Sequence, residues 1–273
     1  MKNLKGLPMD CAETILSHTS ARDVCRAAAA CSELRLTGDS DVVWESFLPH
    51  DYQDIISRAY PTLLRKFGSK KELFLFLCNN PLLIDGGTKM FVLDINSGHK
   101  SYVLSARELS IAWSSDPLYW SWKNEPQSRF DDVAELRTTS WLEIHGKFNT
   151  KFLSPNTTYG AYLIFNISQR AYGLDKKPMQ TLVQVDNGPI SSNTVYFSQD
   201  NYGNKQCMKW TLNYNNCTKS ARNDGWMEIE LGLFYNGECG DVNDEVKMSL
   251  MEIEGCHLKA GLVIEGIEIR PLN

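Results

Sequence analysis

Residues 226–231 read Trp226-Met227-Glu228-Ile229-Glu230-Leu231, and this stretch decides the class of the larger part of the chain. Apolar and acidic residues alternate in it, as expected of a strand whose successive side chains point to opposite faces of a sheet. The same alternation recurs in further stretches separated by Gly, Asn and Pro: 141–145, 159–165, 194–197, 246–253 and 262–271. Half-buried strands at this spacing, without long helices between them, predict an antiparallel all-β sandwich with a jelly-roll-like arrangement.

The first eighty residues have a different periodicity, with apolar residues at helical spacing. One helix is predicted directly after Leu7-Pro8, and a third over residues 41–48. Between them, the capping box Ser20-Ala21-Arg22-Asp23 predicts the start of a second helix that ends at Gly38. The fold class predicted for the whole chain is therefore α + β multidomain, with a small three-helix domain before the sandwich.

The predicted boundaries follow the change of periodicity. A connector precedes the β domain, with a helix capped at Ser69 and a hairpin around Ser97-Gly98. The three predicted parts are a helical domain at 1–50, the connector with helices and a β-hairpin at 51–104, and the β domain at 105–273.

Composition excludes several classes of protein. The chain has 273 residues, of which 42% are hydrophobic, and no stretch approaches the roughly 20 apolar residues that span a bilayer. With 28 Lys plus Arg against 33 Asp plus Glu, the net charge of −5 gives no overall positive field to attract nucleic acid. The eight cysteines include no CxxC pair, and no histidine lies at metal-ligand spacing. We therefore expect no membrane or nucleic-acid partner, no metal and no cofactor.

The N-terminal residues predict where the protein is found. Asp10 and Glu13 interrupt the region that a secretory signal would need to be apolar. We therefore expect a reduced, intracellular protein. Nucleus and cytoplasm are both expected locations, and the balance between them stays open. The sequons at Asn156, Asn166 and Asn216 are then expected to stay unmodified.

The helical domain carries motifs in a telling order: Leu7-Pro8, then Ile15-Leu16, then Trp44 within Asp41-Val42-Val43-Trp44. In this order they resemble an F-box of the plant type. The resemblance implies docking onto the Skp-type adaptor of a cullin-RING ubiquitin ligase. Contact with that adaptor is expected through Leu7, Pro8, Ile15, Leu16, Val24 and Trp44.

From periodicity alone, two interpretations of these helices remain open. So small a domain buries little surface and needs a partner to be stable. That partner is either the rest of its own chain or a helix of another protein lying in an apolar groove.

An aromatic cluster begins the β domain. Trp113, Tyr119, Trp120 and Trp122 lie within ten residues around an Asp-Pro turn. An indole has a flat apolar face that suits the C–H face of a pyranose ring, but it also fills cores. Trp120 and Trp122 share one face if the segment is extended, so at least one of the aromatic residues is expected to pack inward.

The aromatic segment and the strands together resemble the tobacco leaf lectin (Nictaba) and phloem protein 2 family. An F-box followed by this domain is the arrangement of the B-type phloem protein 2 proteins. The blocks that carry the resemblance are 106–113, 119–123, 133–137, 141–147, 224–228 and 266–271.

The resemblance implies binding of N-acetylglucosamine-containing glycans without catalysis. By motif, the sugar-contact tryptophans correspond to Trp113 and Trp120, and two acidic residues of the site to Glu245 and Glu252. We expect two departures from the family pattern to reduce the sugar affinity or to alter the specificity: Leu118 stands where polar residues are usual, and Leu258 lies where relatives often have an aromatic residue.

An enzyme is the weaker hypothesis. Glu228 and Glu230 lie two apart on a predicted strand, so both carboxylates face one side at a separation that glycosidases use. Paired acids on the outer face of a strand are more often solvated surface, and no triad order, phosphate loop or HExxH motif accompanies them. We predict a non-catalytic protein.

The predicted function is that of the substrate-recognition subunit of an SCF-type ubiquitin ligase. The helical domain docks on the Skp adaptor and cullin complex, and the lectin domain captures glycoproteins. Two alternatives stay open: a phloem or stress lectin without a ligase role, and a module that binds proteins only. Dimerisation of the lectin domain also stays open.

Overall fold

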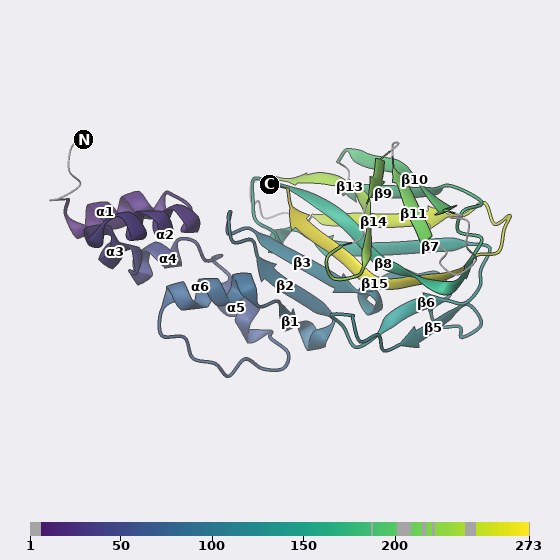
Figure 1. Ribbon diagram of the computed structural model, residues 1–273, viewed down its shortest axis with the longest axis horizontal. Helices are drawn as coiled ribbons and strands as arrows, with labels where there is room; N and C mark the ends of the chain where they lie inside the picture. The colour runs from purple at the N-terminus through teal and green to yellow at the C-terminus, as the bar shows by residue number, and fades with distance from the viewer. Residues whose placement is uncertain are drawn as a thin grey trace. The chain divides into compact units, whose positions relative to one another are not determined.

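The computed structural model describes residues 7–186, 188–200, 209–214, 217–219, 222–237 and 244–272 (Figure 1). The chain forms two compact units. The first comprises Met1–Gly86 and Met90–Ser101, and the second comprises Gly87–Lys89 and Tyr102–Asn273.

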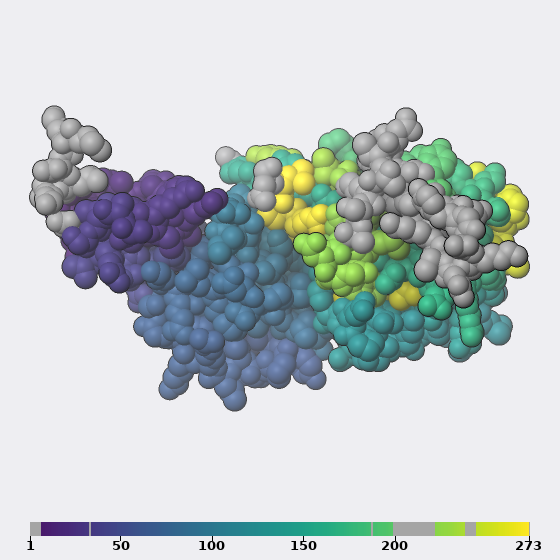
Figure 2. All heavy atoms as spheres, viewed as in Figure 1, coloured from purple at the N-terminus to yellow at the C-terminus, as the bar shows by residue number. Residues whose placement is uncertain are grey.

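Short helices dominate the first unit, whose residues are coloured purple to blue in Figure 2. They are α1 (Met9–Ser17), α2 (Ala21–Ala30), α3 (Ser32–Gly38), α4 (Asp41–Glu45), α5 (Tyr52–Ser57) and α6 (Lys70–Asn79). The capping box is confirmed, because the Ser20 hydroxyl accepts the amide N–H of Asp23 at 3.1 Å. The Ser69 hydroxyl caps α6 in the same way, through the amide of Glu72.

The prediction of one continuous second helix is wrong. Cys31 has the extended backbone angles φ −144° and ψ 127°, so it ends α2 and begins α3. The third predicted helix is also shorter than expected, since α4 ends at Glu45. The chain between residues 9 and 45 therefore forms four short helices where three were predicted.

Trp44 organises the core of the first unit. Its side chain is buried, and its indole N–H donates to the Gly38 carbonyl at 2.7 Å, which fixes the end of α3. Its ring centroid lies 5.8 Å from that of Phe47 and 5.4 Å from that of Phe74 on α6. One indole therefore ties three helices together.

The first unit also contains most of a predicted hairpin. Strands β1 (Leu82–Ile84) and β2 (Lys89–Leu93) precede β3 (Lys100–Ser105), and β2 and β3 are neighbours. The turn forms where predicted: the Asp94 amide donates to the His99 carbonyl, and Gly98 takes a positive φ of 70°.

The second unit is an antiparallel β-sandwich, as predicted. One sheet contains β3, β5 (Trp120–Lys123), β6 (Val133–Leu136), β8 (Thr157–Tyr172), β13 (Met227–Asn236) and β15 (Ala260–Pro271). The other has the order β12 (Cys217–Lys219), β11 (Lys209–Tyr214), β10 (Ile190–Asp200), β9 (Met179–Val185), β14 (Glu245–Glu252), β7 (Leu142–Asn149) and β4 (Ser110–Ile111).

Apolar side chains from the two sheets meet in the middle of the sandwich. The rings of Phe165 on β8 and Phe197 on β10 lie 5.6 Å apart, and those of Tyr102 on β3 and Phe148 on β7 lie 4.9 Å apart. These contacts explain the alternation in the sequence of β7, where every second residue is buried.

Strand β15 has a bulge where its neighbour changes. Residues 263–264 pair with β6 and residues 266–269 pair with β3, while β8 follows the other edge. Glu265 is the extra residue at the register shift. A Cβ on Gly266 would lie 1.9 Å from the Leu104 carbonyl oxygen, so the close approach of β3 requires glycine there.

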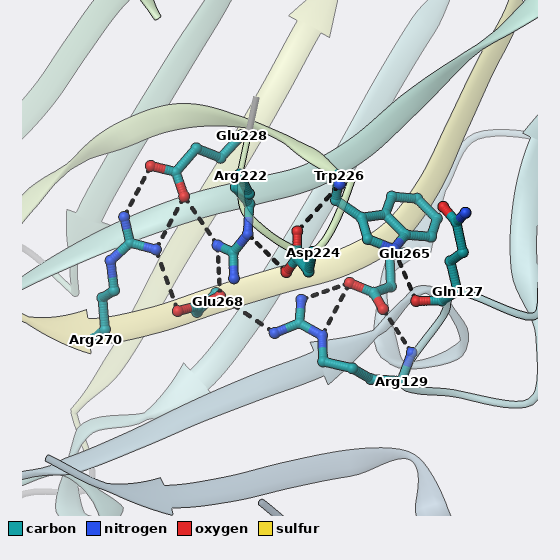
Figure 3. Close-up of polar contacts among 9 residues, drawn as sticks. All are labelled: Gln127, Arg129, Arg222, Asp224, Trp226, Glu228, Glu265, Glu268 and Arg270. Carbon is teal, nitrogen blue, oxygen red and sulfur yellow. Dashed lines mark hydrogen bonds and ion pairs between the residues drawn. The ribbon is translucent and has the colours of Figure 1, made fainter. Parts of the chain in front are cut away.

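The bulge carries a buried charge. Glu265 is 0% exposed, and its carboxylate accepts the backbone N–H of Arg129 at 2.7 Å and the Arg129 Nε–H at 3.1 Å. Figure 3 shows that this pair continues into a cluster of ion pairs. Its other members are Arg222, Asp224, Glu228, Glu268 and Arg270. The cluster fixes segments distant in sequence on the sheet that contains β15.

We expect Gly266→Ala to destabilise the protein by about 1–3 kcal/mol, because the added methyl group forces β15 away from β3. Gly237→Ala is the matched control, since a Cβ there meets only Tyr235 Cε1 at 3.9 Å. Thermal unfolding followed by circular dichroism measures both. Equal stability of the two variants would contradict this account of the bulge.

Candidate functional site

The first unit has an open apolar groove. It has a volume of about 300 Å³ and is lined by Leu7, Met9, Ala12, Ile15, Leu16, Leu34, Leu36 and Thr37. Leu7, Met9, Ile15 and Leu36 are exposed, although each side chain is large and apolar. An exposed apolar groove of this kind fits an amphipathic helix of another protein.

The structure brings together half of the residues predicted for partner contact. Leu7, Ile15 and Leu16 line the groove, and Pro8 lies exposed at the start of α1. Val24 and Trp44 do not reach it, because both side chains are fully buried in the core. The sequence analysis missed Met9 on α1. It also missed Leu34 and Leu36, because the wrong continuous helix hid the turn at Cys31 that presents α3 to α1.

Trp113 is an exposed aromatic residue in a constrained turn. Its backbone adopts a φ of +57°, which is rare for a bulky side chain, and 47% of the residue is exposed. Its ring centroid lies 5.4 Å from that of Tyr119 at an interplanar angle of 36°. The indole is thus supported on one side and open to solvent on the other.

Trp120 lies in the core. It is 2% exposed, and its indole N–H donates to the Ala112 carbonyl at 3.0 Å. No face of this ring is free to stack on a sugar. Because Ala112 directly precedes Trp113, the buried indole instead holds the turn that presents Trp113.

Glu252 is engaged inside the protein. It is buried and forms an ion pair with the buried Lys259, whose Nζ also donates to the Ser140 carbonyl at 2.8 Å and the His257 carbonyl at 3.1 Å. An ammonium group has three donors, so these contacts use all of them. The pair joins the end of β14 to the start of β15.

The strand register separates the two predicted acidic residues. Glu245 pairs with Asn149 at one end of β14, and Glu252 pairs with Leu142 at the other. Seven residues of extended strand span about 23 Å. Trp113 lies at the same end as Glu252, because the Ala112 amide donates to the Glu143 carbonyl on β7. The structure therefore does not gather the four predicted residues into one site.

Glu228 is not placed as a general acid. Its carboxylate accepts from Arg270 Nη2 at 2.9 Å and from Arg222 Nη1 at 2.9 Å. Burial alone would raise the pKa of Glu228, but the two guanidinium groups outweigh it and hold the pKa below its usual range. A carboxylate held ionised in this way cannot act as the protonated general acid that glycoside hydrolysis requires.

Two negative findings apply to the described residues. Among them, no three His, Cys, Asp or Glu side chains gather closely enough to hold a metal ion. In the same part of the chain, no helix is long and apolar enough to cross a membrane.

Fold and candidate sites together describe a two-part protein, with an apolar groove on a helical unit and an exposed indole on a β-sandwich. The chain belongs to the phloem protein 2 family, whose model matches residues 99–271.

Relatives cover nearly the whole chain. F-box protein PP2-B15 of Arabidopsis thaliana is 47% identical over 97% of this chain and 96% of its own. F-box protein PP2-B13 of the same plant is 45% identical over 97% of this chain and 98% of its own. A family 35 carbohydrate-binding module from Clostridium thermocellum matches 62% of this chain and 96% of its own at 9% identity and a TM-score of 0.32.

We expect Lys259→Met to destabilise the protein by about 3–5 kcal/mol, because it leaves the Glu252 carboxylate buried without its partner. Lys147→Met is the control: Lys147 pairs with Glu245 on the surface at 3.2 Å, so its loss changes stability by less than about 0.5 kcal/mol. Adding Glu252→Gln to Lys259→Met should restore part of the loss. Thermal unfolding of all variants tests this, and similar effects at both lysines would contradict the buried pair's role.

Proposed function

We propose that this protein is the substrate-recognition subunit of an SCF-type cullin-RING ubiquitin ligase. Its helical unit is an F-box that docks on a Skp-type adaptor, and its β domain binds N-acetylglucosamine-containing glycans of target proteins. The adaptor role requires no catalytic residue, because holding the target near the ligase raises the rate of transfer by proximity. We place this activity in the nucleus and the cytoplasm.

The apolar groove is the observation that carries the docking half of the proposal. Leu7 and Ile15 expose large apolar side chains on a small helical unit. Exposed apolar side chains gathered in this way are typical of a protein–protein interface and not of a surface that faces only water. Full-length relatives named F-box proteins support the same conclusion.

The exposed indole of Trp113 supports the glycan half. A ring held in a strained turn by Trp120 and Tyr119 is preorganised, so little entropy is lost when a sugar stacks on it. Of the two tryptophans implied by the family resemblance, we assign the contact to Trp113 and a positioning role to Trp120.

Replacing Leu7 and Ile15 together with alanine should abolish capture of a purified Skp-type adaptor by the full-length protein, because the variant loses two of the four large exposed apolar side chains that line the groove. Leu64→Ala is the control, since Leu64 is 88% exposed but lies outside the groove. Unchanged binding of the double variant would reject this docking surface and favour a lectin without a ligase role.

Trp113→Asn should reduce binding of N-acetylglucosamine-containing glycans about tenfold or more on a glycan array, since it removes the stacking face. Asparagine tolerates the positive φ of this turn, so the fold is expected to stay intact by circular dichroism. If the wild type binds no glycan while partner proteins still bind, the β domain is a protein-interaction module instead.

A further inference from the structure

Trp141 is a second exposed indole held beside a fixed carboxylate. It is 37% exposed, and its ring N–H donates to Glu143 Oε2 at 3.0 Å. The other oxygen of Glu143 lies 2.7 Å from His145 Nε2. These contacts with His145 and Trp141 hold the pKa of Glu143 below its usual range, so the carboxylate stays ionised.

The backbone also holds Trp141 in place. The Thr139 hydroxyl donates to the Trp141 carbonyl at 2.8 Å and accepts its amide N–H at 3.1 Å. Thr139 is in turn bridged to Lys259, the buried lysine that pairs with Glu252. An exposed indole fixed through both its ring and its backbone is preorganised for contact.

The turn that carries Trp113 follows the strand next to β7, at the same end of the sheet as Trp141. Strand β4 pairs with β7 through Ser110 with His145 and Ile111 with Ile144, and the Ala112 amide donates to the Glu143 carbonyl at 3.0 Å. Neighbouring strands lie about 4.8 Å apart. The register therefore brings the turn of Trp113 next to the segment that carries Trp141 and Glu143.

Further exposed apolar side chains surround this segment. Tyr172 bonds to the Thr138 hydroxyl at 3.0 Å, Ile253 follows the residue paired with Leu142, and Leu258 precedes the residue bridged to Thr139. We call Trp113, Trp141, Tyr172, Ile253 and Leu258 the sandwich rim.

The chemistry of the rim distinguishes between kinds of ligand. Each oxygen of an ionised carboxylate has two acceptor sites. Glu143 can therefore accept hydrogen bonds from hydroxyl groups of a ligand in addition to its two contacts within the protein. A pyranose offers both an apolar face for the indoles and hydroxyl donors for the carboxylate. An apolar helix would bury that carboxylate without donors, which costs free energy.

We infer that Trp141 is the second stacking residue of the glycan site and that Glu143, positioned by His145, accepts hydrogen bonds from the sugar hydroxyls. This inference rests on the proposed glycan binding of the β domain. It replaces Trp120 and Glu252, which lie in the core, with residues that a ligand can reach.

The test is titration of the full-length protein with chitotriose by calorimetry. Trp141→Ala should weaken binding about fivefold to tenfold, whereas Trp141→Phe, which keeps a ring, should stay within about threefold of the wild type. Glu143→Gln should weaken binding by a similar factor, because the neutral amide is a poorer acceptor. Tyr235→Ala, which removes a more exposed aromatic residue from β13 on the other sheet, should change nothing.

The positioning role of His145 has its own readout. His145→Ala should weaken chitotriose binding. His145→Gln should bind chitotriose as the wild type does, because the Gln amide can donate a hydrogen bond to Glu143 as the imidazole does. If neither variant differs from the wild type, His145 has no positioning role.

Failure of the inference can be told from failure of the proposed function. Loss of binding in Trp113→Asn with full binding in Trp141→Ala and Glu143→Gln would overturn the inference and leave the function standing. A wild-type protein that binds neither chitotriose nor any glycan of an array would overturn both.

Discussion

Burial of the Glu265 carboxylate against Arg129 is the constraint on which the sandwich depends. A buried carboxylate is tolerated only when its oxygens are filled by strong donors, and Arg129 supplies its backbone amide as well as its guanidinium. The pair therefore pins residue 129 to the point where β15 changes neighbours from β6 to β3. Three strands that are distant in sequence obtain their register from this one strand.

A second buried ion pair fixes the chain at the end of the sandwich that carries the candidate glycan site. Lys259 directly precedes β15, and its ammonium joins Glu252 at the end of β14 to the carbonyl of Ser140. Removing either charge would leave the other stranded in the core, so the pair specifies position more than it adds stability. The segment that carries Trp141 is thereby fixed without using any of its ligand-facing groups.

Much of this architecture could be predicted from the sequence, because alternation reports directly on burial between two sheets. The strand over 142–149 is the clearest example, since every second residue of it is buried. The break at Cys31 could not be predicted in the same way. No Gly or Pro marks it, and its cause is the packing of short helices on one another.

The site was harder to predict, although one signal was available. Glu252 has an even residue number, as do Val246, Met248 and Leu250, which are buried on the same strand. Glu245 has an odd number, so alternation places it on the opposite face. Two residues seven apart on a strand must face opposite sides, so alternation alone separates them. Odd and even residue numbers could not distinguish the exposed Trp113 from the buried Trp120, because the chain turns between them and the strand alternation does not continue through the turn.

The two candidate surfaces differ in one chemical respect that separates their ligands. The groove of the helical unit is lined by aliphatic side chains, with Thr37 its one hydroxyl residue among the lining residues, so a partner's apolar helix leaves no charge unsatisfied there. The sandwich rim places an ionised carboxylate beside its indoles, so a ligand must bring hydroxyl donors as well as an apolar face. Each surface therefore disfavours the ligand of the other for the same reason: a polar group buried without a hydrogen-bond partner costs free energy.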